Sequence, residues 1–122
     1  MQRFFMSLAH SNLGIHLGQV AALDSAVCLI LGRLRRSGAW QSSSAVGRVF
    51  ARIHGDEARH VAIARAYAGE LCSREDLLAC AAETREQLVG LLAGRARALD
   101  GLGICPDSLF RQLRSPPRRL FK

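Results

Sequence analysis

The chain has 122 residues, of which 49% are hydrophobic and 6% aromatic, and its formal net charge is +7. The length excludes two large domains, and an Ala- and Leu-rich composition with three prolines is typical of an all-α helical bundle. Because Asp24 interrupts the most apolar segment, Leu17 to Leu31, we expect no membrane span. The first residues lack a long apolar core with a cleavage site, so we predict no signal peptide and a cytoplasmic protein.

The positions of the basic residues and cysteines bear on nucleic-acid binding, disulfides and zinc sites. Basic residues gather near the end of the chain, but no aromatic residues alternate with them, and no nucleic-acid motif is present. We therefore expect no nucleic-acid partner, and interpret the charge as a solvated surface. The cysteines lack a C-x-x-C spacing, which favours free thiols over disulfides or a zinc site. They are Cys28, Cys72, Cys80 and Cys105.

The first helical region is predicted from about Met6 to Arg36, with a break near Gly14 or Gly18 left open. Apolar residues recur along it at steps of three and four, and Asp24 occupies the centre of that stripe. The segment from Ser37 to Ser44 has the Gly and Ser residues of a turn that ends one helix and caps the next. Its short length predicts two antiparallel neighbouring helices.

The second predicted helix contains Arg48 to Leu71, and its expected inner stripe holds two polar residues, Glu57 and His60. These two residues stand three apart, so they share one helix face and could bind a single metal ion. Burying a carboxylate and an imidazole costs about 2–7 kcal/mol or more without partners, so a cation or a plain ion pair must compensate. The complete stripe is Val46, Phe50, Ile53, Glu57, His60, Ala64, Tyr67 and Leu71.

The expected hairpin predicts which residue faces Glu57. If the turn is centred between Trp40 and Gln41, Asp24 lies as far before the turn as Glu57 lies after it. An off-centre turn would instead bring Gln19 level with the motif. A carboxylate opposite a Glu-x-x-His pair is half of the ligand set found in di-iron carboxylate bundles.

The rest of the chain predicts one more long helix and one short helix. Ser73, with Asp76 three residues later, has the pattern of a capping box, and this helix is expected to continue to about Leu99. A short helix is predicted from Asp107 to Arg114. We therefore expect one helical domain over residues 1–114, followed by a basic tail over residues 115–122.

The run RIHGDEARHVAIA, residues 52–64, resembles the DEARH segment of the ferritin-like superfamily, which includes rubrerythrin and bacterioferritin. The resemblance implies an antiparallel ferritin-like bundle in which Glu57 and His60 bind iron, as a di-iron centre, or manganese. The family's carboxylate from the preceding helix would fall on Asp24 or Gln19. The implied activity is oxygen-dependent oxidoreduction of an unidentified small molecule, as in di-iron oxidases and hydroxylases.

The chain has one Glu-x-x-His motif, whereas a complete site of this superfamily uses two. Three interpretations follow. Two copies could form a homodimer in which each supplies half of the site. The chain could instead pair with a second, different ferritin-like half. In the third interpretation the metal is lost, and the bundle is a scaffold or a protein-interaction module.

Four further residues are candidates for a supporting role. Asp56 could orient an imidazole from outside the ligand set, although a helix-surface acid more often faces water. Tyr67 could lie beside an oxygen-activating site, but burial statistics favour a role in filling the core. The amide oxygen of Gln19 is a weaker metal ligand than a carboxylate. His16 is expected at the periphery of the site.

Overall fold

The computed structural model describes residues 2–7, 10–115 and 120–121. These residues form six α-helices and no strand, so the predicted all-α bundle is confirmed. Three of the helices are long and pack together. In chain order the helices are α1 (Gln2–Ser7), α2 (Leu13–Arg36), α3 (Ala45–Leu71), α4 (Arg74–Ala93), α5 (Ala96–Gly101) and α6 (Pro106–Arg114).

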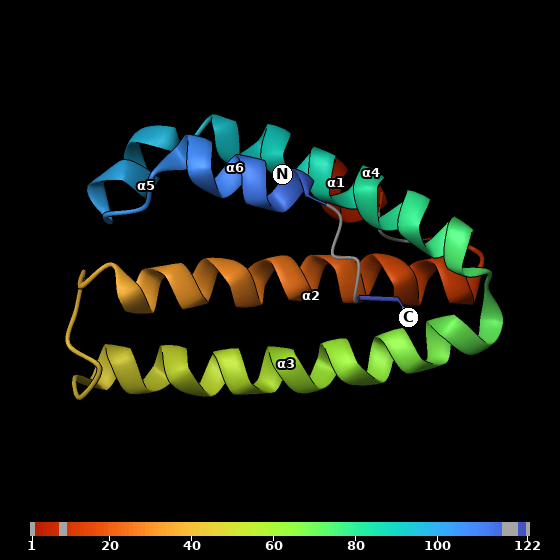
Figure 1. The fold of residues 1–122 in the computed structure, drawn as a ribbon, viewed down its shortest axis with the longest axis horizontal. Helices are drawn as coiled ribbons and strands as arrows, with labels where there is room; N and C mark the ends of the chain where they lie inside the picture. Colours follow the sequence, from red (N-terminus) through yellow and green to blue (C-terminus); the bar gives the residue numbers. More distant parts are fainter. Residues whose placement is uncertain (1, 8–9, 116–119, 122) are drawn as a thin grey trace.

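Helix α2 lies in the middle of the molecule, with α3 on one side and α4 and α6 on the other (Figure 1). Helices α2 and α3 are antiparallel, as the short turn between them predicted. Gly38 enters this turn with a φ of 74°, a left-handed conformation that glycine adopts without steric cost. Helix α2 also has the length and apolar composition that would let it cross a membrane, a property that core helices of bundles share.

The possible break near Gly14 is observed just before Leu13, whereas the predicted end of the third long helix is wrong. The first region is divided, because Asn12 accepts a hydrogen bond from the backbone N–H of Ile15 at 3.1 Å and begins α2 after a separate α1. Helix α4 starts as predicted, with the Ser73 hydroxyl accepting the N–H of Asp76 at 3.1 Å. It ends at Ala93 rather than near Leu99, since the weak helix former Gly94 allows a turn before α5.

Small side chains allow α2 and α3 to approach closely. Ala21, Ala22, Ala64 and Ala68 are buried in one apolar cluster shared by the two helices. At Gly14 an added Cβ would lie 2.4 Å from the Cys72 sulfur, so this position tolerates only glycine without rearrangement. The face of α3 that packs against α2 is therefore the one with the smallest side chains.

The predicted inner stripe of α3 is partly wrong: Phe50, Glu57 and Ala64 face inward, but His60 and the large apolar residues Val46, Ile53, Tyr67 and Leu71 are exposed. The observed inward positions are Gly47, Phe50, His54, Glu57, Val61, Ala64 and Ala68. The large apolar residues on the neighbouring side of the helix are exposed and form what we call the α3 flank. It comprises Val46, Val49, Ile53, Ile63, Tyr67 and Leu71, with exposed fractions from 37% to 58%.

The opposite side of α2 holds the larger core side chains. Leu77, Val89, Leu109 and Leu113 from α4 and α6 are almost fully buried. Near the end of the chain, Leu120 and Phe121 are also buried, packed against the cluster of small residues on α2, α3 and α4. The other residues of the predicted tail after Ser115 lie outside the described part of the chain.

Candidate metal-binding site

Asp24, Glu57 and His60 come together between α2 and α3. One ligand atom from each of the three side chains lies within 4.8 Å of the other two. Glu57 and His60 occupy successive turns of α3, and Asp24 on α2 lies opposite them because the turn is centred close to Trp40. The expected facing of Asp24 and Glu57 is therefore observed.

The spacing of the three ligand atoms is close to that of a formed metal site. Oxygen and nitrogen ligands bind a divalent transition metal at about 2.1 Å, so two ligands of one ion lie at most about 4.2 Å apart. The observed limit of 4.8 Å means that small side-chain movements would complete the contact. His60 can make such a movement, since its side chain is 60% exposed.

The electrostatics of the cluster are unfavourable without a cation. Desolvation by burial, followed by the negative charge of Glu57, raises the pKa of Asp24 from 3.8 to about 6. The nearest compensating group is His60, whose Nδ1 lies 3.5 Å from a carboxylate oxygen of Glu57. Above pH 6, once Asp24 is ionised, the site thus holds two neighbouring carboxylates.

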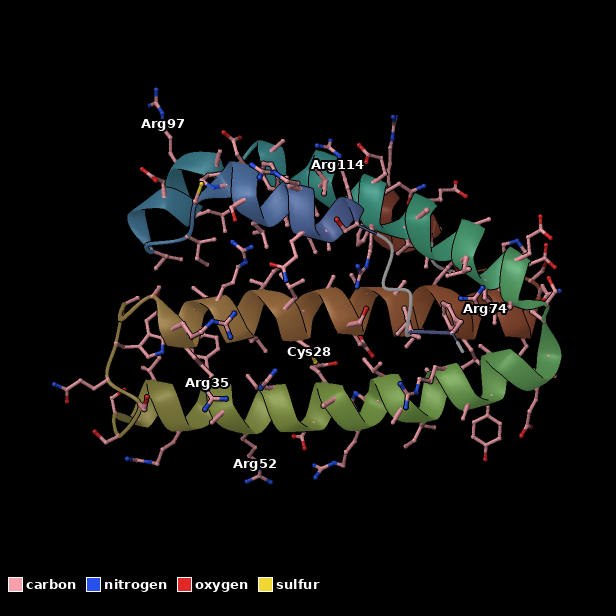
Figure 2. The ribbon with its side chains drawn as sticks, viewed as in Figure 1. Cys28, Arg35, Arg52, Arg74, Arg97 and Arg114 are labelled. Carbon is pink, nitrogen blue, oxygen red and sulfur yellow. The ribbon has the colours of Figure 1, made fainter. Side chains whose placement is uncertain are left out.

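A thiol lies beside the cluster and was not predicted. The Sγ of Cys28 on α2 points to the backbone carbonyl of His54 on α3 at 3.9 Å, and Figure 2 shows Cys28 between the two helices. Burial first, and then the charges of Glu57 and Asp24, raise the pKa of this thiol. Its position could have been predicted, because Cys28 follows Asp24 by four residues and so shares its helix face.

The four supporting candidates lie at different distances from the cluster. Asp56 forms an ion pair with Arg59, which occupies the carboxylate with a guanidinium. Tyr67 is 58% exposed on the α3 flank, so the core-filling interpretation is wrong. Gln19 is half-buried on α2, more than one turn before Asp24, and His16 lies about two turns before it. Neither Gln19 nor His16 shares the level of Glu57.

The donor set indicates which ions fit. Two carboxylates and one imidazole suit Fe(II) and Mn(II), since these ions accept oxygen and nitrogen ligands and leave positions open for other molecules. The set contains no thiolate within ligand reach among the described residues, which disfavours Cu(I) and structural zinc. The residues of this chain therefore fit iron or manganese, with three protein ligands from one copy.

Comparisons with protein-family models, with curated proteins and with solved structures find no significant match to this chain. The ferritin-like assignment therefore stays a prediction from the sequence around Glu57 and His60.

Proposed function

We propose that this protein is a ferritin-like, non-haem iron or manganese protein with an oxygen-dependent oxidoreductase activity on a small molecule. The observation that carries the proposal is the convergence of Asp24, Glu57 and His60 within 4.8 Å of one another. A bound ion of this kind would supply one-electron redox chemistry. The chain's own residues would hold it, neutralise part of its charge and leave its solvent-facing side open to the substrate.

An ion pair alone does not explain the cluster of Asp24, Glu57 and His60. A protein-only ion pair would place a guanidinium or ammonium group against the carboxylate, as Arg59 does for Asp56. Asp24 and Glu57 instead have an exposed imidazole as their opposite group, and burial, followed by repulsion from Glu57, raises the pKa of Asp24. A divalent cation removes that repulsion, and its binding free energy would offset the desolvation of both acids.

The α3 flank supports assembly into a homodimer. Six large apolar residues lie exposed along α3, and Ile53 and Ile63 stand one turn before Glu57 and one turn after His60. The flank consists of two apolar groups, Val46 to Ile53 and Ile63 to Leu71, on either side of the segment that holds Glu57 and His60. Isolated exposed apolar residues are common, but grouped ones on one side of a helix favour an interaction surface. A second copy placed on the α3 flank would bring its own Asp24, Glu57 and His60 toward the first set. Such a pair could hold two ions between two helix hairpins.

A second candidate function is a metal-free scaffold or protein-interaction module. The observation that favours it is the exposure of His60, because a solvated imidazole needs no metal to compensate its burial. In this case the α3 flank would bind a partner, and the polar cluster would only mark the edge of the contact.

Elemental analysis combined with size-exclusion chromatography separates the two candidates. We expect iron or manganese in the purified protein at a fixed ratio to the chain, and loss of that metal in Glu57→Gln and His60→Ala. Arg52→Gln is a matched control, because Arg52 is an exposed residue of the same helix that points away from α2 (Figure 2). A stable protein that contains and accepts neither metal would contradict the proposal and favour the scaffold.

The homodimer is tested independently of the metal. Ile63→Glu places a charge in the α3 flank, whereas Ala62→Glu places the same charge on an adjacent exposed position outside it. We expect sedimentation equilibrium to show a monomer for Ile63→Glu and a dimer for Ala62→Glu, with unchanged helical circular dichroism. Identical masses for the two variants would refute the role of the flank.

A further inference from the structure

The α3 flank has the same pattern of bulky apolar residues when it is followed in either direction along the helix. Its midpoint is level with Ala58. Ile53 and Ile63 each lie five residues from Ala58, and all of these residues belong to α3. Val49 and Tyr67 each lie nine residues from Ala58. The four apolar side chains are exposed, so this repeated pattern is available to a partner.

A surface of this kind fits a second copy of the same chain. When two identical helices are related by a twofold axis perpendicular to them, they run antiparallel. A residue before the midpoint then lies level with the residue the same number of positions after the midpoint on the second copy. Ile53 would therefore face Ile63 of the second copy, and Val49 would face Tyr67 of the second copy. Apolar side chains would meet apolar side chains on both sides of the midpoint and leave water together.

The middle of the flank is polar and carries complementary groups. Asp56 and His60 each lie two residues from Ala58, so the same axis places Asp56 level with His60 of the second copy. Both side chains are accessible, since that of Asp56 is 40% exposed and that of His60 is 60% exposed. A carboxylate opposite an imidazole favours this register over one that is shifted along the helix, which would place the polar groups against apolar side chains.

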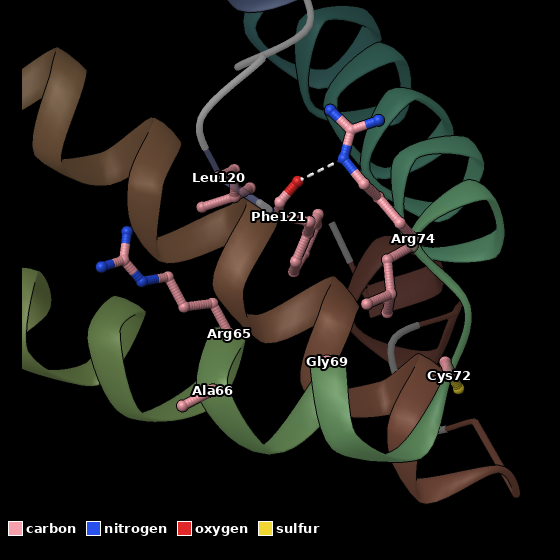
Figure 3. A pocket seen from close by; sticks show the side chains of 8 residues that line it. Arg65, Ala66, Gly69, Cys72, Arg74, Leu120 and Phe121 are labelled. Atoms are coloured by element: carbon pink, nitrogen blue, oxygen red, sulfur yellow. Dashed lines mark hydrogen bonds between the residues drawn. The ribbon is translucent and has the colours of Figure 1, made fainter.

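The other side of α3 does not have this pattern. Its C-terminal part carries Arg65, Ala66 and Gly69, which are charged or small. Figure 3 shows these residues beside the chain end at Leu120 and Phe121, with which they line one pocket. The α3 flank is therefore the side of the helix that offers a second copy a matching set of bulky apolar residues.

We propose that two copies pair antiparallel through their α3 flanks, about an axis level with Ala58, so that Asp56 of each copy orients His60 of the other. This inference rests on the homodimer proposed above, and it assigns a residue of the second copy to the metal site. The Nδ1 of His60 lies 3.5 Å from Glu57, which leaves Nε2 to donate to the facing carboxylate. Within its own chain Asp56 pairs with Arg59 through Oδ1, so Oδ2 is the acceptor for the second copy. A carboxylate in this position fixes the ring of a ligating histidine and makes it a stronger ligand.

Disulfide cross-linking tests the register. Ile53→Cys and Ile63→Cys are placed in separate chains that also carry Cys105→Ser, because Cys105 is an exposed native thiol. The two chains are co-expressed with tags of different size and oxidised. We expect a disulfide that joins the two different chains, and none that joins two identical chains. Ile53→Cys with Ala62→Cys is the control and should give no cross-link, since Ala62 is exposed outside the flank.

The alternative outcomes are distinct. Disulfides between identical chains would show a parallel contact and overturn the inference. Cross-linking no greater than in the Cys105→Ser parent would show that no second copy occupies the flank in this register, and would overturn it as well. Metal binding by a monomer would overturn this inference but not the proposed metal site. The expected cross-links in a protein that binds no metal would refute the metal site and the role of Asp56, and would keep the antiparallel contact.

Mixed dimers test whether Asp56 acts across the interface. Asp56→Asn and His60→Ala should each weaken Mn(II) binding at least tenfold, with an unchanged dimer mass. Glu70→Gln is the control, because it removes an exposed acid of α3 far from the midpoint and should leave the affinity unchanged. A purified dimer of one Asp56→Asn chain and one His60→Ala chain retains one intact Asp56 opposite one intact His60.

We expect this mixed dimer to bind Mn(II) with wild-type affinity at one site per dimer, although neither parent does so. A mixed dimer that binds no more tightly than its parents would show that Asp56 does not act on His60 of the second copy, and would overturn the inference.

Discussion

Among the described residues, two groups of polar side chains on opposite sides of α2 are stabilised in different ways. Arg85 on α4 is 4% exposed, and its guanidinium donates to the carbonyls of Leu113 and Ser115 and to the hydroxyl of Ser25. Asp24 and Glu57, on the other side of α2, face each other as two acids beside a largely exposed His60. The first group is enclosed and has several internal partners, whereas the second is partly exposed and pairs two acids with one imidazole.

The difference indicates a structural role for Arg85 and supports the proposed metal-binding role of the Asp24 cluster. The Arg85 guanidinium connects α4 to α2 and to the end of α6, where helix carbonyls lack partners and favour a cation. Its burial lowers the pKa of the guanidinium, but no ligand is needed to explain its position. The Asp24 cluster gains no comparable internal compensation, so an external cation is the simplest explanation for its retention between two packed helices.

Arg85→Ala should produce the largest loss of stability. The change leaves a cavity and removes the partner of one buried carbonyl, one partly buried carbonyl and one hydroxyl, for an expected loss of about 3 kcal/mol in the free energy of unfolding. Urea denaturation followed by circular dichroism measures this loss. Arg97→Ala on α5 is the control, since Arg97 extends into solvent (Figure 2) and should change stability by less than about 0.5 kcal/mol. Equal effects of the two changes would contradict the structural role of Arg85.

A glycine pair tests the turn that places Asp24 opposite Glu57. At Gly47 an added Cβ would lie 2.4 Å from the backbone oxygen of Gln41, whereas at Gly55 it would meet open space. Gly47→Ala should therefore cost about 2 kcal/mol through overpacking, and Gly55→Ala should stabilise α3 by about 0.5–1 kcal/mol. Thermal unfolding of both variants gives the comparison. A stabilising Gly47→Ala would show that the turn has a different conformation.

The sequence predicted correctly which residues of α2 and α3 lie opposite each other, but it predicted less well which face of α3 packs against α2. Asp24 was placed opposite Glu57 correctly, because a short turn between antiparallel helices fixes which residues are level. The inner face of α3 was assigned to the largest apolar residues, such as Ile53 and Tyr67. The structure buries Gly47 and Ala68 instead, since close packing against the alanines of α2 favours small side chains.

Two other features depended on contacts that a sequence does not reveal. Arg85 lies between acidic residues on a long helix, which is typical of a surface position, although its place beside Thr84 on the apolar face was a signal of burial. Leu120 and Phe121 are buried because the end of the chain packs against α4, where Arg74 donates a hydrogen bond to the Phe121 carbonyl. The spacing of residues in the sequence did not predict this contact. Long-range contacts of this kind arise from the folded topology alone.

Asp24→Asn should change the free energy of unfolding by a smaller amount, and the sign of the change depends on whether a metal is bound. In the metal-free protein, the unfolded chain releases the Asp24 proton near pH 3.8 and the folded chain near pH 6. Stability therefore falls as the pH rises through this window, and the ionised Asp24 remains destabilising above it. Because the group is only half-buried, Asp24→Asn should stabilise the metal-free protein at pH 7 by about 1 kcal/mol, less than the full shift implies.

Addition of Mn(II) should reverse that order, because a bound cation favours the ionised carboxylate. Unfolding of wild type and Asp24→Asn at pH 5 and pH 7, with and without Mn(II), measures both signs. A wild type that stays less stable than Asp24→Asn at saturating Mn(II) would show that Asp24 does not contribute to binding.

Electron paramagnetic resonance of Mn(II) tests the central claim most directly, because the six-line signal of the free aqueous ion decreases as the ion binds. Titration of the metal-free protein at pH 7 should show saturable loss of this signal in wild type and in Arg52→Gln, and at least a tenfold weaker effect in Glu57→Gln and His60→Ala. If the free signal persists in wild type, or decreases equally in all four proteins, Asp24, Glu57 and His60 do not form a metal site.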